Sequence, residues 1–167
     1  MKSYFTTLSI TRMALLAAIY ASLTLALAPI SFGPFQIRAS EALTVLPFLF
    51  PWAIPSLFVG CLLANIIGTF MGVSFGMLDI IFGSLASLLA AYLTSKCKKF
   101  WLAPFPPVII NAVVIGALIT IFTPEAGVAG FWMFAGSVGL GQVAACYGLG
   151  IPLLLTIKRF APKFNAS

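Results

Sequence analysis

Apolar runs long enough to cross a lipid bilayer follow one another along almost the whole chain. Of the 167 residues, 62% are apolar and 7% are charged, whereas soluble domains average about 25% charged residues. Nine basic and three acidic side chains cannot solvate the surface of a globule this rich in aliphatic and aromatic residues. A soluble fold is therefore excluded, and the chain is predicted to be an integral membrane protein.

Helices account for these runs better than the strands of a β-barrel do. Barrel strands are segments of about ten residues that alternate apolar and polar side chains, whereas these runs are longer and apolar on every face. We predict an all-α polytopic membrane protein with six transmembrane helices in one domain, 1–167, with no room for a separate soluble domain. The expected helices cover 13–29, 40–51, 56–70, 75–94, 107–122 and 131–157.

The first run also resembles a secretory signal peptide with Ala26-Leu27-Ala28 before its cleavage site. Pro29 would then be the first mature residue, a poor position for a peptidase, whereas proline is common where a helix ends. We therefore keep the run as a helix. The second helix is expected to begin with Ser40 as its cap and Glu41 in its first turn, and to be short or kinked because it is rich in proline.

The positions of the basic residues predict how the chain is oriented. With both termini inside the cell, six helices leave only Arg38 outside and place the other eight basic residues in cytoplasmic segments. An odd number of helices would separate the lysines at 96–99 from the basic C-terminal tail. The eight are Lys2, Arg12, Lys96, Lys98, Lys99, Lys158, Arg159 and Lys163.

The chain lacks the residues that several classes of function require. The chain has no histidine and three scattered cysteines, so we expect no metal site and no Ser-His-Asp or Cys-His nucleophile. A phosphate-binding loop is missing, so any energy from ATP must come from partner subunits. The basic excess belongs to cytoplasmic loops, which argues against nucleic acid as a partner. We expect a protein that is not an enzyme and carries no cofactor.

Polar side chains near the hydrocarbon are costly, so the few present are candidate binding residues. They are Arg38, Glu41, Asn65, Asp79, Asn111, Glu125, Gln142 and Tyr147. Each also has a structural interpretation: helix capping, a loop ion pair, a solvated loop acid, or hydrogen bonds between helices. The ionisable members come from four segments and share the outer side, which predicts one outward-facing cleft. Trp132 is either an interfacial anchor or a stacking platform for a planar ligand.

Small residues recur at four-residue intervals, which lets helix backbones approach closely. In the first helix, Ala14 and Ala18 form one such pair, and Ala17 and Ala21 form another. These alanines either pack inside the bundle or dock a second membrane protein. Periodicity leaves both interpretations and both registers open.

Three segments carry a resemblance to a known family. Phe35-Gln36-Ile37-Arg38-Ala39-Ser40-Glu41-Ala42-Leu43-Thr44-Val45-Leu46-Pro47 resembles the signature of the queuosine precursor transporter family, QueT, whose members are S components of energy-coupling factor (ECF) transporters. The segments 55–65 and 78–86 are similar to helices of the same family. The resemblance covers nearly the whole chain.

The resemblance implies a six-helix S component of an ECF-type ABC importer in the plasma membrane of a prokaryote. It would capture a deazaguanine precursor of queuosine outside the cell. Two ATPase subunits and a transmembrane T subunit would power uptake, with the T subunit docking on an Ala-x-x-x-Ala face of the first helix. Both alanine pairs fit that face.

The chemistry of a deazaguanine suits the polar residues. Its pairing edge presents adjacent N–H donors to a carboxylate, and its aminomethyl form adds a cation. We expect one of Glu41, Asp79 and Glu125 to accept from the edge and another to pair with the amine. A carboxamide would read the ring carbonyl, and Trp132 or Tyr147 would stack on the ring. The carboxamides are Asn65, Asn111 and Gln142.

Other functions compete with this one. A stand-alone secondary carrier or channel for a small cationic or vitamin-like solute is the first alternative, followed by an intramembrane enzyme and a structural scaffold. The choice among aminomethyl-deazaguanine (preQ1), its nitrile analogue (preQ0) and queuine stays open at this point.

Overall fold

The computed structural model describes residues 6–32 and 36–160, and within them the chain is helical without a β-strand. The helices are α1 (Thr7–Ala26), α2 (Ala28–Ser31), η1 (Ala39–Phe48), α3 (Ala53–Phe70), η2 (Asp79–Gly83), α4 (Ser84–Lys96), η3 (Phe100–Leu102), α5 (Phe105–Phe122), η4 (Pro124–Ala126), α6 (Gly127–Val143), η5 (Ala144–Gly150) and α7 (Ile151–Phe160). Of these, η1, η3 and η4 are 3-10 helices, and η2 and η5 are π-helices.

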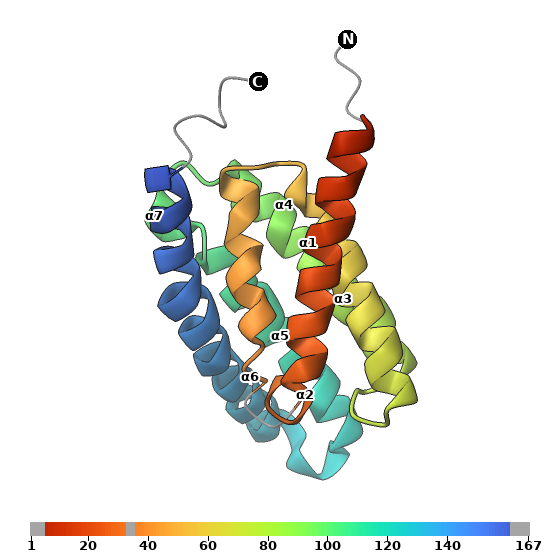
Figure 1. Cartoon of the computed structure of the whole chain (residues 1–167). Coiled ribbons are helices and arrows are strands. Elements are labelled where there is room, and N and C mark those ends of the chain that lie inside the picture. Colours follow the sequence, from red (N-terminus) through yellow and green to blue (C-terminus); the bar gives the residue numbers. More distant parts are fainter. Residues whose placement is uncertain (1–5, 33–35, 161–167) are drawn as a thin grey trace.

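The helices form an elongated bundle whose successive rods run in alternate directions (Figure 1). The π-helix η2 continues into α4, and α6 continues through η5 into α7. The start of α1, the end of α4 and the end of α7 lie at one end of the bundle, whereas α2 and η4 lie at the other (Figure 1). The predicted helical membrane architecture is confirmed at this level.

Four segments are long and apolar enough to cross a membrane. They are Thr7–Ala26, Ala53–Phe70, Phe100–Phe122 and Pro124–Phe160. The rods η1 and η2–α4 are not among them, and the ten residues of η1 are far fewer than the roughly 20 that a spanning α-helix needs. Six membrane crossings with both termini inside therefore stay a prediction.

The first helix begins earlier than the apolar pattern indicates. The Thr6 hydroxyl accepts a hydrogen bond from the Ser9 backbone N–H at 3.2 Å, and this cap starts α1 at Thr7 rather than at residue 13. Arg12 consequently lies within the helix. At the other end, α1 stops at Ala26, and Pro29 lies in the first turn of the short helix α2.

The expected second helix is not an α-helix. Residues Ala39–Phe48 form a 3-10 helix with Pro47 inside it, and 3-10 runs longer than three or four residues are uncommon. Packing compensates for the poorer hydrogen-bond geometry, because most of η1 is buried and it contacts α1, α4 and η5. This inner position brings Arg38 and Glu41 to the interior of the bundle.

Small residues bring neighbouring helices together as the sequence predicted. A Cβ built on Gly60 of α3 would lie 2.8 Å from the Ala17 carbonyl oxygen of α1. Ala17 and Ala21 are buried, whereas Ala14 and Ala18 are exposed. The two alanine pairs therefore lie on different faces of α1, and Ala17 and Ala21 pack inside the bundle.

Candidate functional site

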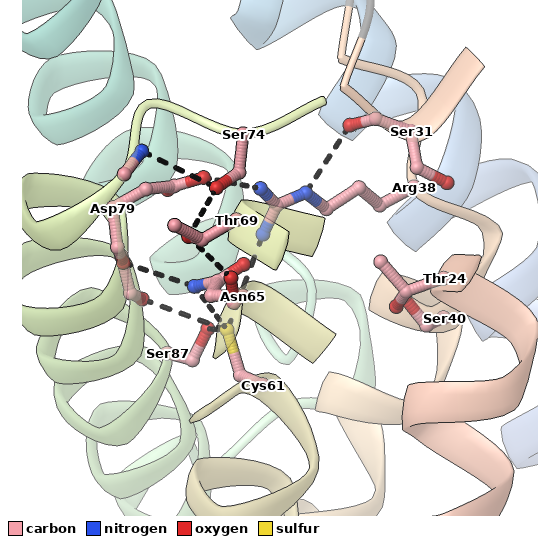
Figure 2. A network of polar contacts seen from close by, with 12 residues as sticks. Thr24, Ser31, Arg38, Ser40, Cys61, Asn65, Thr69, Ser74, Asp79 and Ser87 are labelled. Atoms are coloured by element: carbon pink, nitrogen blue, oxygen red, sulfur yellow. Dashed lines mark hydrogen bonds and ion pairs between the residues drawn. The ribbon is translucent and has the colours of Figure 1, made fainter. Parts of the chain in front are cut away.

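A buried ion pair lies at the centre of the candidate site (Figure 2). Arg38 Nη2 lies 3.5 Å from Asp79 Oδ2, and both side chains are almost fully buried. Arg38 immediately precedes η1, and Asp79 is the first residue of η2. The Arg38 Nε donates to the Ser31 carbonyl at 3.2 Å, and the guanidinium lies over the Phe32 ring. Arg38 thus ties the α2 segment to η2.

The backbone of η2 is held by Asn65, on α3. The Asn65 Nδ2 donates to the Asp79 carbonyl at 3.0 Å, and both residues are fully buried. A Cβ built on Gly83 would lie 2.7 Å from Asp79 Oδ1 and 3.0 Å from Asn65 Nδ2. A side chain at this position would therefore displace these two groups from where they lie. π-helical turns are rare and often occur at functional sites.

Glu41 is the second buried acid, and Tyr20 of α1 fixes it. The Tyr20 hydroxyl donates to Glu41 Oε1 at 2.6 Å, with both residues at most 1% exposed. Glu41 also interacts electrostatically with Arg38. One residue earlier, the Ser40 hydroxyl shares a 2.6 Å hydrogen bond with Thr24. Ser40 therefore binds α1 by its side chain, and no side-chain cap is formed at the start of η1.

Asn111 and Gln142 form a carboxamide pair beside Glu41. The Asn111 Nδ2 donates to Gln142 Oε1 at 3.2 Å, and Asn111 also interacts with the Glu41 carboxylate. The Cys146 thiol, on η5, approaches the Glu41 carbonyl at 3.5 Å. These two amides link α5 and α6 as interhelical hydrogen bonds do, and they do so next to an acid of the site.

The Cys61 thiol contacts three polar side chains of the site, and the sequence did not indicate this role. Its Sγ lies 3.5 Å from Asn65 Nδ2, 3.2 Å from Ser87 Oγ and 4.0 Å from Arg38 Nη1 (Figure 2). Cys61 is fully buried, in an otherwise apolar run. Only its spacing of four residues from Asn65, which places both on one face of α3, could have indicated this role.

Many buried polar atoms of this region have no hydrogen-bond partner within the described part of the chain. They are Ser31 Oγ, Gln36 Nε2, Arg38 Nη2, Glu41 Oε2, Asn65 Oδ1, both carboxylate oxygens of Asp79, and Ser84 Oγ. Arg38 Nη2 and Asp79 Oδ2 still face each other as the ion pair, whereas the other atoms are unpaired within the described residues. A buried polar group left unpaired costs about 1–3 kcal/mol, so a cluster of them is expected to bind solute or water. The carboxylate and Asn65 oxygens only accept, and the two serine hydroxyls can accept as well, which suits a ligand that presents N–H donors.

Gln36 is a further residue that the sequence did not single out. It is 1% exposed and adopts a φ of 44°, which is uncommon for a residue other than glycine. Such backbone strain persists only where the surrounding structure enforces it, and it concentrates at binding sites.

The structure does not bring every predicted residue to this cluster. Glu125 is exposed on η4, a turn that contacts α5 and α6, so three of the four ionisable candidates converge and Glu125 does not. Trp132 is 70% exposed, as an interfacial anchor would be, and Tyr147 is half-buried on η5. Among residues 6–32 and 36–160, no three His, Cys, Asp or Glu side chains are placed to share a metal ion.

Comparisons with known proteins show the family of the chain. The family described as QueT transporter matches residues 10–159. A curated relative, the queuosine precursor transporter QueT of Lactococcus lactis subsp. cremoris (strain MG1363), is 35% identical over 103 residues, and the match spans 57% of each chain. No solved structure matches the chain significantly. Because the family match covers nearly the whole bundle and all of the buried cluster, the chain belongs to the QueT transporter family.

Proposed function

We propose that this protein is the S component of an ECF-type importer that captures a queuosine precursor outside the cell. The observation that carries the proposal is a buried cluster of one cation and two acids, Arg38, Glu41 and Asp79, in a member of the QueT transporter family. Charged groups inside a membrane protein are costly and generally mark substrate pathways. The candidate substrates are the deazaguanines preQ1, preQ0 and queuine.

The acceptors of the cluster suit the pairing edge of such a base. Glu41 Oε2 and the Asp79 oxygens are buried carboxylate atoms without a hydrogen-bond partner in the described chain. One carboxylate accepts the adjacent N–H donors of the base, and the other pairs with an aminomethyl cation where the ligand has one. The Gln36 carboxamide and the Arg38 guanidinium are donors for the ring carbonyl.

The exposed Ala14–Ala18 face of α1 supports docking of a T subunit at this register. Leu15 beside it is 61% exposed, so the face is apolar as well as smooth. Close backbone approach at small residues is a general way in which membrane helices associate. ATP hydrolysis then takes place in partner ATPase subunits, and this chain supplies substrate recognition.

We also infer six membrane crossings, with both described ends of the bundle on the cytoplasmic side. The alternating rods and the shared end of α1, α4 and α7 support this topology (Figure 1). The short rod η1 is shielded by α1, α4 and η5, which is how a segment too short to span alone is tolerated. Cysteine labelling from each face of intact vesicles tests it: a cysteine at position 125 should react from outside and one at position 98 from inside.

A ligand screen tests the proposed substrate class. The purified chain in detergent is heated with preQ1, preQ0, queuine, guanine and common vitamins. A specific rise in melting temperature with a deazapurine supports the proposal, because a ligand that binds only the folded state stabilises it. Stabilisation by a vitamin and by no deazapurine would contradict it. Uptake that persists in cells lacking the ATPase partners would instead favour a stand-alone carrier.

A further inference from the structure

We propose that a groove between α3 and α4 binds one anionic phospholipid, with an acyl chain in the groove and the phosphate at Lys96. The site is separate from the buried polar cluster and does not depend on the identity of the substrate. It rests on the shape of the groove, on its apolar lining and on the charge at its end.

The groove has a volume of about 550 Å³ and is lined by Ile54, Leu85, Leu88, Leu89 and Tyr92. Four of these residues follow the i, i+3, i+4, i+7 spacing of one helical face, and they extend over roughly 10 Å of α4. Leu85 and Leu89 are about half exposed, at 49% and 50%. The groove is therefore open and apolar, and it runs along a limited length of α4.

Lys96 lies at the end of this groove. Its ammonium is 5.2 Å from the centre of the Tyr92 ring, and Tyr92 lines the groove. Among residues 6–32 and 36–160, no carboxylate lies within 4.0 Å of the Lys96 ammonium. Two of the three acids of the chain are buried in the polar cluster, and Glu125 lies on η4 at the opposite end of the bundle (Figure 1).

Charge complementarity selects the occupant. Exposed Lys98 and Lys99 follow Lys96, so the groove ends in a local excess of positive charge. Basic sites next to membrane helices favour anionic headgroups, at about 1 kcal/mol for each lysine near the surface. An apolar groove that ends at an ammonium suits a phospholipid, in which an acyl chain and a phosphate belong to one molecule. A zwitterionic phospholipid also has a phosphate, but the cation of its own headgroup offsets that charge, so its attraction to the basic end of the groove is weaker.

Native mass spectrometry of the full chain in neutral detergent tests the site. Phosphatidylglycerol and phosphatidylcholine with identical acyl chains are titrated separately, and the affinity of the first bound lipid is compared. We expect phosphatidylglycerol to bind about fivefold more tightly, as one lysine contact provides. The Lys96→Gln variant should lose this preference. Lys158→Gln removes the same charge from the exposed last turn of α7, at the same end of the bundle, and should retain it.

A second variant tests the apolar part. Leu89→Trp fills the groove from a half-exposed position and should weaken binding of both lipids at the first site. Equal affinity for the two lipids, or equal losses in Lys96→Gln and Lys158→Gln, would overturn the proposal, because attraction to the basic end in general would then explain the binding. Lipid binding unchanged by Leu89→Trp, with a second copy or partner helix cross-linking to the groove, would also overturn it.

Discussion

Arg38 and Asp79 form an ion pair 3.5 Å apart inside the bundle. The buried Glu41 carboxylate interacts electrostatically with the same guanidinium but forms no ion pair with it within the described residues. Removing one partner from a buried pair leaves an uncompensated charge, which costs several kcal/mol, whereas replacing both partners with apolar groups costs much less. The cluster is thus a sensitive place to test both the fold and the site.

Replacing one partner of the pair should destabilise the protein more than replacing both. Asp79→Leu removes the ion-pair partner of the buried Arg38 guanidinium. We expect a loss of about 3 kcal/mol in the free energy of unfolding. The double variant Arg38→Met with Asp79→Leu should recover part of that loss, because the Arg38–Asp79 pair is replaced as a whole while Glu41 still loses its interaction with Arg38. Unfolding of the purified variants in detergent measures both values, and additive losses in the double variant would contradict the coupling.

Gly83→Ala should damage the site without removing a polar group. The new Cβ would lie 2.7 Å from Asp79 Oδ1 and 3.0 Å from Asn65 Nδ2, so both side chains must move. Losing one charge-assisted contact to the ligand should weaken binding about tenfold. Gly136→Ala is a matched control, because a Cβ there meets nothing within 4 Å. Similar affinities for the two variants would argue against a role for η2 in binding.

Tyr20→Phe removes only the hydroxyl that donates to Glu41 at 2.6 Å. A hydrogen bond to a charged group contributes about 1.5–3 kcal/mol, and Glu41 would be left with less pairing inside the bundle. We expect a lower melting temperature in the absence of ligand. Tyr92→Phe is the control, since that tyrosine is 49% exposed. A melting temperature equal to that of the parent would show that Glu41 does not need this donor.

The alanine pairs of α1 should respond differently to enlargement. Ala17→Leu forces a side chain against Gly60, whose position leaves no space beside the Ala17 backbone, so the variant should fold poorly. Ala14→Leu should fold and bind ligand normally because Ala14 is exposed. It should lose co-purification with the proposed T subunit. Assembly that survives Ala14→Leu and Ala18→Leu together would place the docking face elsewhere.

The sequence predicted the class of fold because burying apolar runs in lipid requires helices. It also predicted Arg38, Glu41 and Asp79 as site residues, since charges in such runs need partners. It missed the 3-10 form of η1, because a ten-residue 3-10 helix is held by its neighbours and not by local preference. The sequence predicted Glu125 as a site residue together with the other acids. The charge pattern indicates on which side of the membrane a segment is expected to lie, but it does not indicate how far apart two segments on that side are.

Cys61, Tyr20 and Gln36 were missed for a related reason. Tyr20 and Cys61 have side chains that are common in apolar cores, and only the rotation of their helices brings them to the cluster. Gln36 lies in the non-helical segment before η1, where the sequence does not show that it is buried. A periodic pattern shows which residues share a face of one helix. It does not show which face of the neighbouring helix they meet, and that pairing decides which residues form the site.

Calorimetric titration of preQ1 into three charge-neutralised variants tests the central claim, that the buried acids hold the substrate. We predict that Glu41→Gln and Asp79→Asn each weaken binding about tenfold or more, because each loses a charge-assisted contact, while Glu125→Gln binds like the parent. Parent-like affinity in both Glu41→Gln and Asp79→Asn, or a loss confined to Glu125→Gln, would contradict the account.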